Sequence, residues 1–84
     1  MAKPLRFTHH ALAVMNERQV LRAWVERAVY HPQWVEPDPG DSQIERRFHA
    51  VAERDDRILR VACVETSADI RVISTFLDRR ARPK

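Results

Sequence analysis

The sequence contains little cysteine and little glycine: its 84 residues include one of each. The single cysteine, Cys63, cannot form an internal disulfide, and its place in an apolar run predicts a buried, inert thiol rather than a nucleophile. One glycine is too few for a glycine-rich phosphate-binding loop, which excludes the common nucleotide-binding motifs. The scarcity of cysteine makes the cytoplasm the expected location.

Long hydrophobic runs and metal-ligand spacings are also missing. No apolar stretch approaches the ~20 residues that a membrane-spanning helix needs, and the N-terminal residues lack the apolar segment of a signal peptide. His9 and His10 are adjacent and therefore point apart on a helix, and no further His or Cys lies at ligand spacing. We therefore expect no membrane partner, no metal and no cofactor.

The sequence is rich in charge, with 32% charged residues beside 44% hydrophobic residues. This balance is typical of a folded globular domain, and 84 residues allow a single one. A hydrophobic core of that size is marginal, which favours a homodimer or a bound partner.

The net charge of +3 comes from the end of the chain. Residues 1–77 hold 11 basic and 11 acidic side chains, so the excess lies in residues 78–84. We expect a single domain over 1–77 and a basic tail over 78–84. Arg79 and Arg80 of this tail are candidates for binding nucleic acid or an acidic partner, and the alternative is a solvated terminus.

Residues 8–31 have the apolar spacing of helices. Thr8 is a predicted N-cap, because its hydroxyl can accept a hydrogen bond from a free backbone N–H. The helical segment must end before His31 and Pro32, because proline disfavours a helical conformation in the residue before it. The spacing predicts two helices, or one bent helix, over this range.

After Pro32 the pattern changes to that of strands. Short polar links between the later segments require antiparallel neighbours. The expected fold is therefore α+β, with two N-terminal helices packed on one face of a four-stranded antiparallel sheet. The expected strands are residues 33–36 at an edge, 44–53, 57–65 and 70–77, with a loop over 37–41.

Alternation along the strands separates two faces of the expected sheet. The apolar face, expected beneath the helices, comprises Ile44, Phe48, Ala50, Leu59, Val61, Cys63, Ile70, Val72 and Phe76. The opposite, open face is expected to carry Thr75 and four basic or titratable residues, namely Arg47, His49, Arg60 and Arg71. Guanidinium groups stabilise the charge on a transferring phosphate, and histidine transfers protons near neutral pH. These four residues are a candidate site, and the alternative is an ordinary solvated face.

Residues 7–18 resemble the start of a bacterial family of small α+β domains of unknown function, whose pattern runs F-T-x-H-A-x-x-x-M-x-E-R. The resemblance covers residues 6–78 and includes Arg57-x-Leu59-Arg60-Val61, and residues 71–74 also resemble BrnT toxins, relatives of RelE-type ribonucleases. Family members often carry Gly and then Ser after the E-R pair, where this chain has Gln19 and Leu21. The matching residues of the first pattern are Phe7, Thr8, His10, Ala11, Met15, Glu17 and Arg18.

The resemblance implies a RelE/BrnT-like fold and a toxin-like, metal-independent endoribonuclease. RNA, free or on the ribosome, would then be the substrate, and an antitoxin protein would be a partner. RelE-type members use scattered basic and acidic residues, so the resemblance gives no residue of this chain a firm catalytic role. Our candidates are His10 or His49 for proton transfer, and Arg60, Arg47 and Arg71 for binding the phosphate.

Other interpretations of the same residues stay open. Arg18 either contacts phosphate or forms a salt bridge at the end of its helix, and His10 either acts chemically or packs. The alternative function is a non-catalytic module that binds nucleic acid or protein, including an inactive dimeric relative. The balanced charge of residues 1–77 favours this alternative, because RNA-binding proteins usually carry a basic excess.

Overall fold

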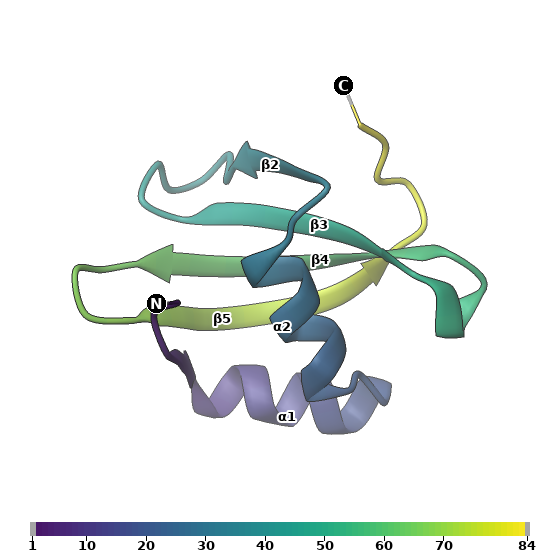
Figure 1. Cartoon of the computed structure of the whole chain (residues 1–84), viewed down its shortest axis with the longest axis horizontal. Coiled ribbons are helices and arrows are strands. Elements are labelled where there is room, and N and C mark those ends of the chain that lie inside the picture. Colours follow the sequence, from purple (N-terminus) through teal and green to yellow (C-terminus); the bar gives the residue numbers. More distant parts are fainter. Residues whose placement is uncertain (1, 84) are drawn as a thin grey trace.

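Two helices cover one face of a five-stranded mixed sheet in the computed structural model, which describes residues 2–83 (Figure 1). Helix α1 lies over β5, and α2 lies over β3 and β4. The strand order is β1-β5-β4-β3-β2. None of the described helices has the length and apolar character to cross a membrane. The elements are β1 (Leu5–Phe7), α1 (His9–Arg18), α2 (Arg22–Tyr30), β2 (Trp34–Pro37), β3 (Glu45–Val51), the 3-10 helix η1 (Ala52–Arg54), β4 (Arg57–Glu65) and β5 (Ile70–Asp78).

The predicted α+β class is confirmed, but the sheet has five strands rather than four and is not wholly antiparallel. The additional strand is β1, which pairs in parallel with β5 so that Leu5 lies opposite Ile70 and Phe7 opposite Val72. A hydrogen bond from Thr8 N to Val72 O continues this pairing. Three residues are too few to show strand alternation, which is why the sequence does not reveal β1.

The other strands lie close to their predicted ranges. Strand β4 spans the predicted residues 57–65, whereas β5 continues through Asp78, one residue beyond its predicted end. Strand β3 ends at Val51 because the backbone turns into η1 at Ala52. Asp78 therefore belongs to the sheet, and the basic tail begins at Arg79.

The N-terminal segment forms two helices, and Thr8 caps the first one as predicted. Thr8 Oγ1 accepts a hydrogen bond from Ala11 N at 3.0 Å. Helix α1 ends where Gln19 adopts a left-handed conformation, with φ at 58°. Helix α2 begins after Leu21, whose side chain makes no capping hydrogen bond. The chain therefore breaks between the helices without the glycine and the serine that the resembled family often has there.

The hydrophobic core lies between the two helices and the sheet. Leu59, Val61 and Cys63 of β4 have no exposed surface, which confirms the predicted apolar side of this strand. Burial raises the pKa of the Cys63 thiol to about 11, as an inert thiol requires. The helix residues of the core are Ala11, Met15, Trp24, Val25, Ala28 and Val29.

The face of strand β3 that packs against the helices is the opposite of the face that its sequence predicts. The register places Arg47 opposite Val61 and His49 opposite Leu59, and directly opposed residues point to the same face. Arg47 and His49 therefore lie on the helix side. Alternation tells which residues of one strand share a face, but it does not tell which face the helices cover.

Phe48 consequently lies on the open face, where Trp34 shields it. The two rings stack with their centroids 4.6 Å apart and an interplanar angle of 4°. Phe48 is only 3% exposed, although no helix covers it. A cross-strand aromatic pair can thus bury an apolar side chain on the open face of a sheet.

A β-bulge in β5 reverses which of its side chains point toward the helices in the second half of the strand. Ile73 is an extra residue in the pairing of β5 with β4. Beyond it, Thr75 lies opposite Val61 on the helix side, and Phe76 lies opposite Arg60 on the open side. The predicted positions of Phe76 beneath the helices and of Thr75 on the open face are therefore wrong, because the sequence pattern gives no sign of the extra residue. Thr75 Oγ1 is buried without a hydrogen-bond partner in the described part of the chain.

Candidate nucleic-acid interface

The four residues predicted to share one sheet face lie on two faces. Arg60 and Arg71 point to the open side, whereas Arg47 and His49 point toward the helices. The prediction of a single four-residue site is therefore wrong. Its cause is the register of β3, which turns the odd-numbered residues of that strand to the helix layer.

Neither candidate histidine lies beside Arg60. His10 is exposed in the first turn of α1. His49 is half-buried on the helix side of β3, where its Nδ1 lies 2.8 Å from the carbonyl oxygen of His31, at the end of α2. The side chain of His49 contacts His31 O and that of Arg60 contacts Asp78, and neither histidine lines the two hollows beside Arg60.

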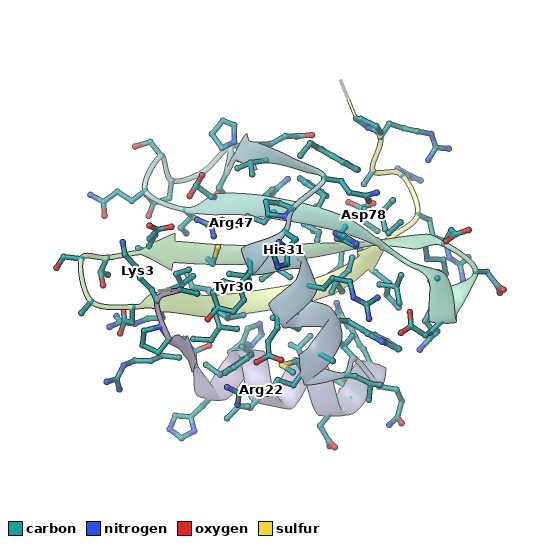
Figure 2. All side chains as sticks on the ribbon, viewed as in Figure 1. Lys3, Arg22, Tyr30, His31, Arg47 and Asp78 are labelled. Carbon is teal, nitrogen blue, oxygen red and sulfur yellow. The ribbon has the colours of Figure 1, made fainter. Side chains whose placement is uncertain are left out.

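Arg47 is a buried structural residue. It is 8% exposed and donates a hydrogen bond of 3.0 Å to Val29 O near the end of α2 (Figure 2). It also pairs with Glu45 at 3.0 Å and with Glu65 at 2.8 Å. Hydrogen bonds from Lys3 and Arg47 lower the pKa of Glu65 to about 2. Because its donors are engaged inside the protein, Arg47 is poorly placed to hold a phosphate.

Two other predicted phosphate-binding residues meet at Phe76. The guanidinium carbon of Arg60 lies 4.6 Å from the centroid of the Phe76 ring, and that of Arg18 lies 5.2 Å from it. Arg60 also donates to Asp78 Oδ2 at 3.2 Å. Arg18 forms no ion pair with any described residue, so a salt bridge at the helix end is not what holds it. Phe76 is thus flanked by one arginine from α1 and one from β4.

Arginines without a carboxylate partner gather at the end of the sheet where β4 begins and β5 ends. Elsewhere on the described surface arginines form ion pairs, as Arg6 does with Asp69. All but one of the unpaired arginines line adjoining hollows at this end, and the exception, Arg71, lies near the other end of β5. The described arginines that form no ion pair are Arg18, Arg54, Arg57, Arg71, Arg79, Arg80 and Arg82.

The hollow beside Phe76, which we call the Phe76 groove, has a volume of about 340 Å³. It lies where the end of α1, the β3–β4 turn and the end of β5 meet. Its lining residues are Arg18, Arg54, Arg57, Phe76 and Leu77, and none of them is acidic. Arg57 also lines the two hollows that adjoin the groove. The groove therefore surrounds an apolar wall with guanidinium groups.

Two acidic side chains close to these arginines in the sequence are engaged by other arginines. Glu53, next to Arg54 in η1, binds Arg27 of α2 through both carboxylate oxygens at 3.2 Å, which lowers the pKa of Glu53. Asp78 is held by Arg60. Asp55 and Asp56, between Arg54 and Arg57, line the adjoining hollow, so none of these four carboxylates lines the groove itself.

The β3–β4 turn places Arg54 and Arg57 at the groove. Asp55 and Asp56 between them both adopt left-handed conformations, with φ at 56° and 59°. Aspartate tolerates this conformation better than most residues do. The guanidinium carbon of Arg54 lies 5.9 Å from the ring of Trp24, which holds this side chain against α2.

Three residues of the groove are missed by the sequence patterns, which give no role to Arg54 and Arg57 and place Phe76 in the core. One signal was available, because two arginines that flank a two-aspartate turn must emerge at the same end of a sheet. The contribution of Arg18 to the same groove depends on how α1 packs. Residues 18, 57 and 76 are far apart in the sequence, so no local pattern brings them together.

The basic tail runs from the end of β5 past β3 toward the β2 edge of the sheet (Figure 1). Arg80, Ala81, Arg82 and Pro83 line a hollow there together with residues of β2, β3 and β4. Arg79 and Arg80 also line a hollow that shares Phe76 and Leu77 with the groove. The tail thus extends the basic surface around the end of β5, while Lys84 lies outside the described residues.

Comparison with known protein families matches residues 7–76 to a family described as "Domain of unknown function (DUF4258)". The matched span includes both helices and nearly the whole sheet. No curated protein gives a significant match, and no solved structure does.

Proposed function

The chain belongs to the DUF4258 family, a family of domains of unknown function, and from the geometry we propose that it binds single-stranded RNA. The proposed binding surface is the Phe76 groove together with the tail arginines beside it. One observation carries the proposal: arginines without ion-pair partners converge on a half-buried aromatic side chain.

The chemistry of such a groove suits a flexible nucleic-acid strand. Guanidinium groups hold phosphate oxygens through paired hydrogen bonds, and they form a planar surface on which a base can stack. Proteins that bind single strands combine a cationic groove with aromatic contacts in the same way. Arg18 and Arg57 would neutralise phosphates, while Phe76 and Leu77 would contact a ribose or base.

RNA is the partner that the resemblance to BrnT and RelE-type toxins suggests. Cleavage of RNA without a metal, which the same resemblance implies, stays a prediction, as do an antitoxin partner and action on the ribosome. The Phe76 groove contains no histidine among its lining residues, so a neutral-pH proton-transfer group is not at hand there. Binding without cleavage is therefore the function that the geometry supports best.

The proposal predicts that single substitutions in the groove weaken RNA binding. Arg18→Gln and Arg57→Gln should each lower the affinity for a labelled single-stranded oligoribonucleotide about tenfold, because each removes a charge-assisted contact. Fluorescence anisotropy at fixed salt measures the affinity. Gel analysis of the same RNA after incubation with excess chelator tests the predicted cleavage.

Arg71→Gln is the matched control, because Arg71 is also an arginine without an ion pair but lies away from the groove. Its affinity should stay within about twofold of the wild type. Equal losses in Arg18→Gln, Arg57→Gln and Arg71→Gln would show general charge attraction and contradict a defined groove. Arg18 is exposed at the end of α1, so its replacement tests binding even if the Arg57 variant is less stable.

A further inference from the structure

The charge of the Phe76 groove exceeds what one internal phosphate of an RNA chain would require. Arg18, Arg54 and Arg57 all line it, and no carboxylate does. A phosphodiester carries one negative charge, whereas a terminal phosphate monoester carries about 1.5 to 2 near neutral pH. Three guanidinium groups in one groove therefore match a monoester better than a diester.

The arginines of the groove have guanidinium donors that no carboxylate engages. Arg18, Arg54 and Arg57 all line the groove and form no ion pair with any described residue. An anion that enters the groove therefore meets guanidinium groups that are not neutralised by a partner. A terminal phosphate has three free oxygens and can accept from several guanidinium groups at once.

The hollow next to the groove is less suited to an anion, although it shares Arg57. Asp55, Asp56 and Asp78 line it beside Arg57, Arg79 and Arg82, so its charges largely cancel. The Phe76 groove instead combines its arginines with the apolar side chains of Phe76 and Leu77. Its volume of about 340 Å³ lies within the range of small-molecule sites.

We propose that the Phe76 groove recognises the terminal phosphate monoester of an RNA strand, with the terminal nucleoside against Phe76 and Leu77. This inference rests on the proposed function and narrows it from any single strand to a phosphorylated end. The phosphate can stand at the 5′ or the 3′ end of the strand. The guanidinium groups of Arg18, Arg54 and Arg57 bind it and neutralise its charge.

The test compares three versions of one short oligoribonucleotide with an internal fluorescent label: 5′-phosphorylated, 3′-phosphorylated, and with hydroxyls at both ends. Anisotropy with the full chain should show about tenfold tighter binding of one phosphorylated strand than of the hydroxyl strand. The phosphorylated end that binds tighter identifies the source of the phosphate. Arg57→Gln and Arg18→Gln should each reduce this preference to below about threefold, whereas Arg71→Gln should leave it unchanged.

Equal affinities for all three strands, with loss of binding in Arg18→Gln, would overturn the terminal-phosphate inference and leave the RNA-binding function standing. Absence of binding to any strand would overturn both. A preference that persists in both groove variants would place the phosphate elsewhere and overturn the assignment of the groove.

Discussion

Arg47 holds the C-terminal end of α2 on the sheet. Its guanidinium group donates to Val29 O and pairs with Glu45 and Glu65, so one side chain joins α2, β3 and the end of β4. A charge that is 8% exposed is stable only when its hydrogen bonds are made inside the protein. The fold therefore depends on Arg47 in a way that phosphate binding does not.

Replacing Arg47 with methionine should separate stability from binding. Arg47→Met keeps the aliphatic bulk but removes the donor to Val29 O and Glu45 and leaves Glu65 with Lys3 alone. We expect the free energy of unfolding to fall by roughly 2–3 kcal/mol, measured by urea denaturation. The RNA affinity of the folded variant should match the wild type. If the variant had normal stability but no longer bound RNA, the structural role of Arg47 would be contradicted and Arg47 would be an RNA-binding residue.

The junction between α1 and α2 is the element with the weakest local support. Gln19 adopts a left-handed conformation that glycine adopts without strain, and Leu21 begins α2 without a side-chain acceptor for the free backbone N–H groups. Leu21 is 56% exposed, so its side chain contributes little to the core. The break is nevertheless made, because the buried faces of both helices pack on the sheet.

Two substitutions at this junction should stabilise the protein. Gln19→Gly should raise the free energy of unfolding by about 1 kcal/mol by removing left-handed strain. Leu21→Ser should add about 1 kcal/mol by supplying an N-cap acceptor. Thermal and urea denaturation measure both changes. Ala13→Gly, in the exposed interior of α1, is the control and should lower stability by about 1 kcal/mol. If Gln19→Gly destabilised as much as the control, the left-handed conformation at Gln19 would be disproved.

The two strands β3 and β5 show how far local sequence patterns reach. The sequence patterns correctly predict the range of strand β4 (57–65) and the side of it that is buried. They also correctly predict Thr8 as the N-cap of α1. The facing of β3 depends on its register with β4, and the facing of Phe76 depends on the bulge at Ile73. Both are set by tertiary packing, so alternation within one strand does not reveal them.

The candidate site was predictable only in part for the same reason. Arg18 and Arg60 are among the sequence candidates, and the structure brings them to the same aromatic ring. Arg47 and His49 do not belong to the site, because the register of β3 points their side chains toward the helices. Arg57 and Phe76 belong to the site instead, because the end of α1 packs beside the ends of β4 and β5 that carry them.

Across the whole molecule, charge is segregated although residues 1–77 are neutral in sum. Ion pairs neutralise arginines over most of the described surface, while the unpaired arginines other than Arg71 collect where β5 ends. The tail from Arg79 adds its charge at the same end. A nearly balanced chain can thus present a local basic surface, and total charge alone is a poor guide to its partners.

The salt dependence of RNA affinity tests this surface most directly. Each phosphate contact with a single strand contributes a slope of roughly −0.7 in log affinity against log salt. We predict a linear decrease for the wild type, a weaker affinity and a shallower slope for the Arg18→Gln/Arg57→Gln double variant, and a shallower slope also after deletion of residues 79–84. Absence of RNA binding by the wild type, or a double variant with wild-type affinity and slope, would contradict RNA binding through the Phe76 groove.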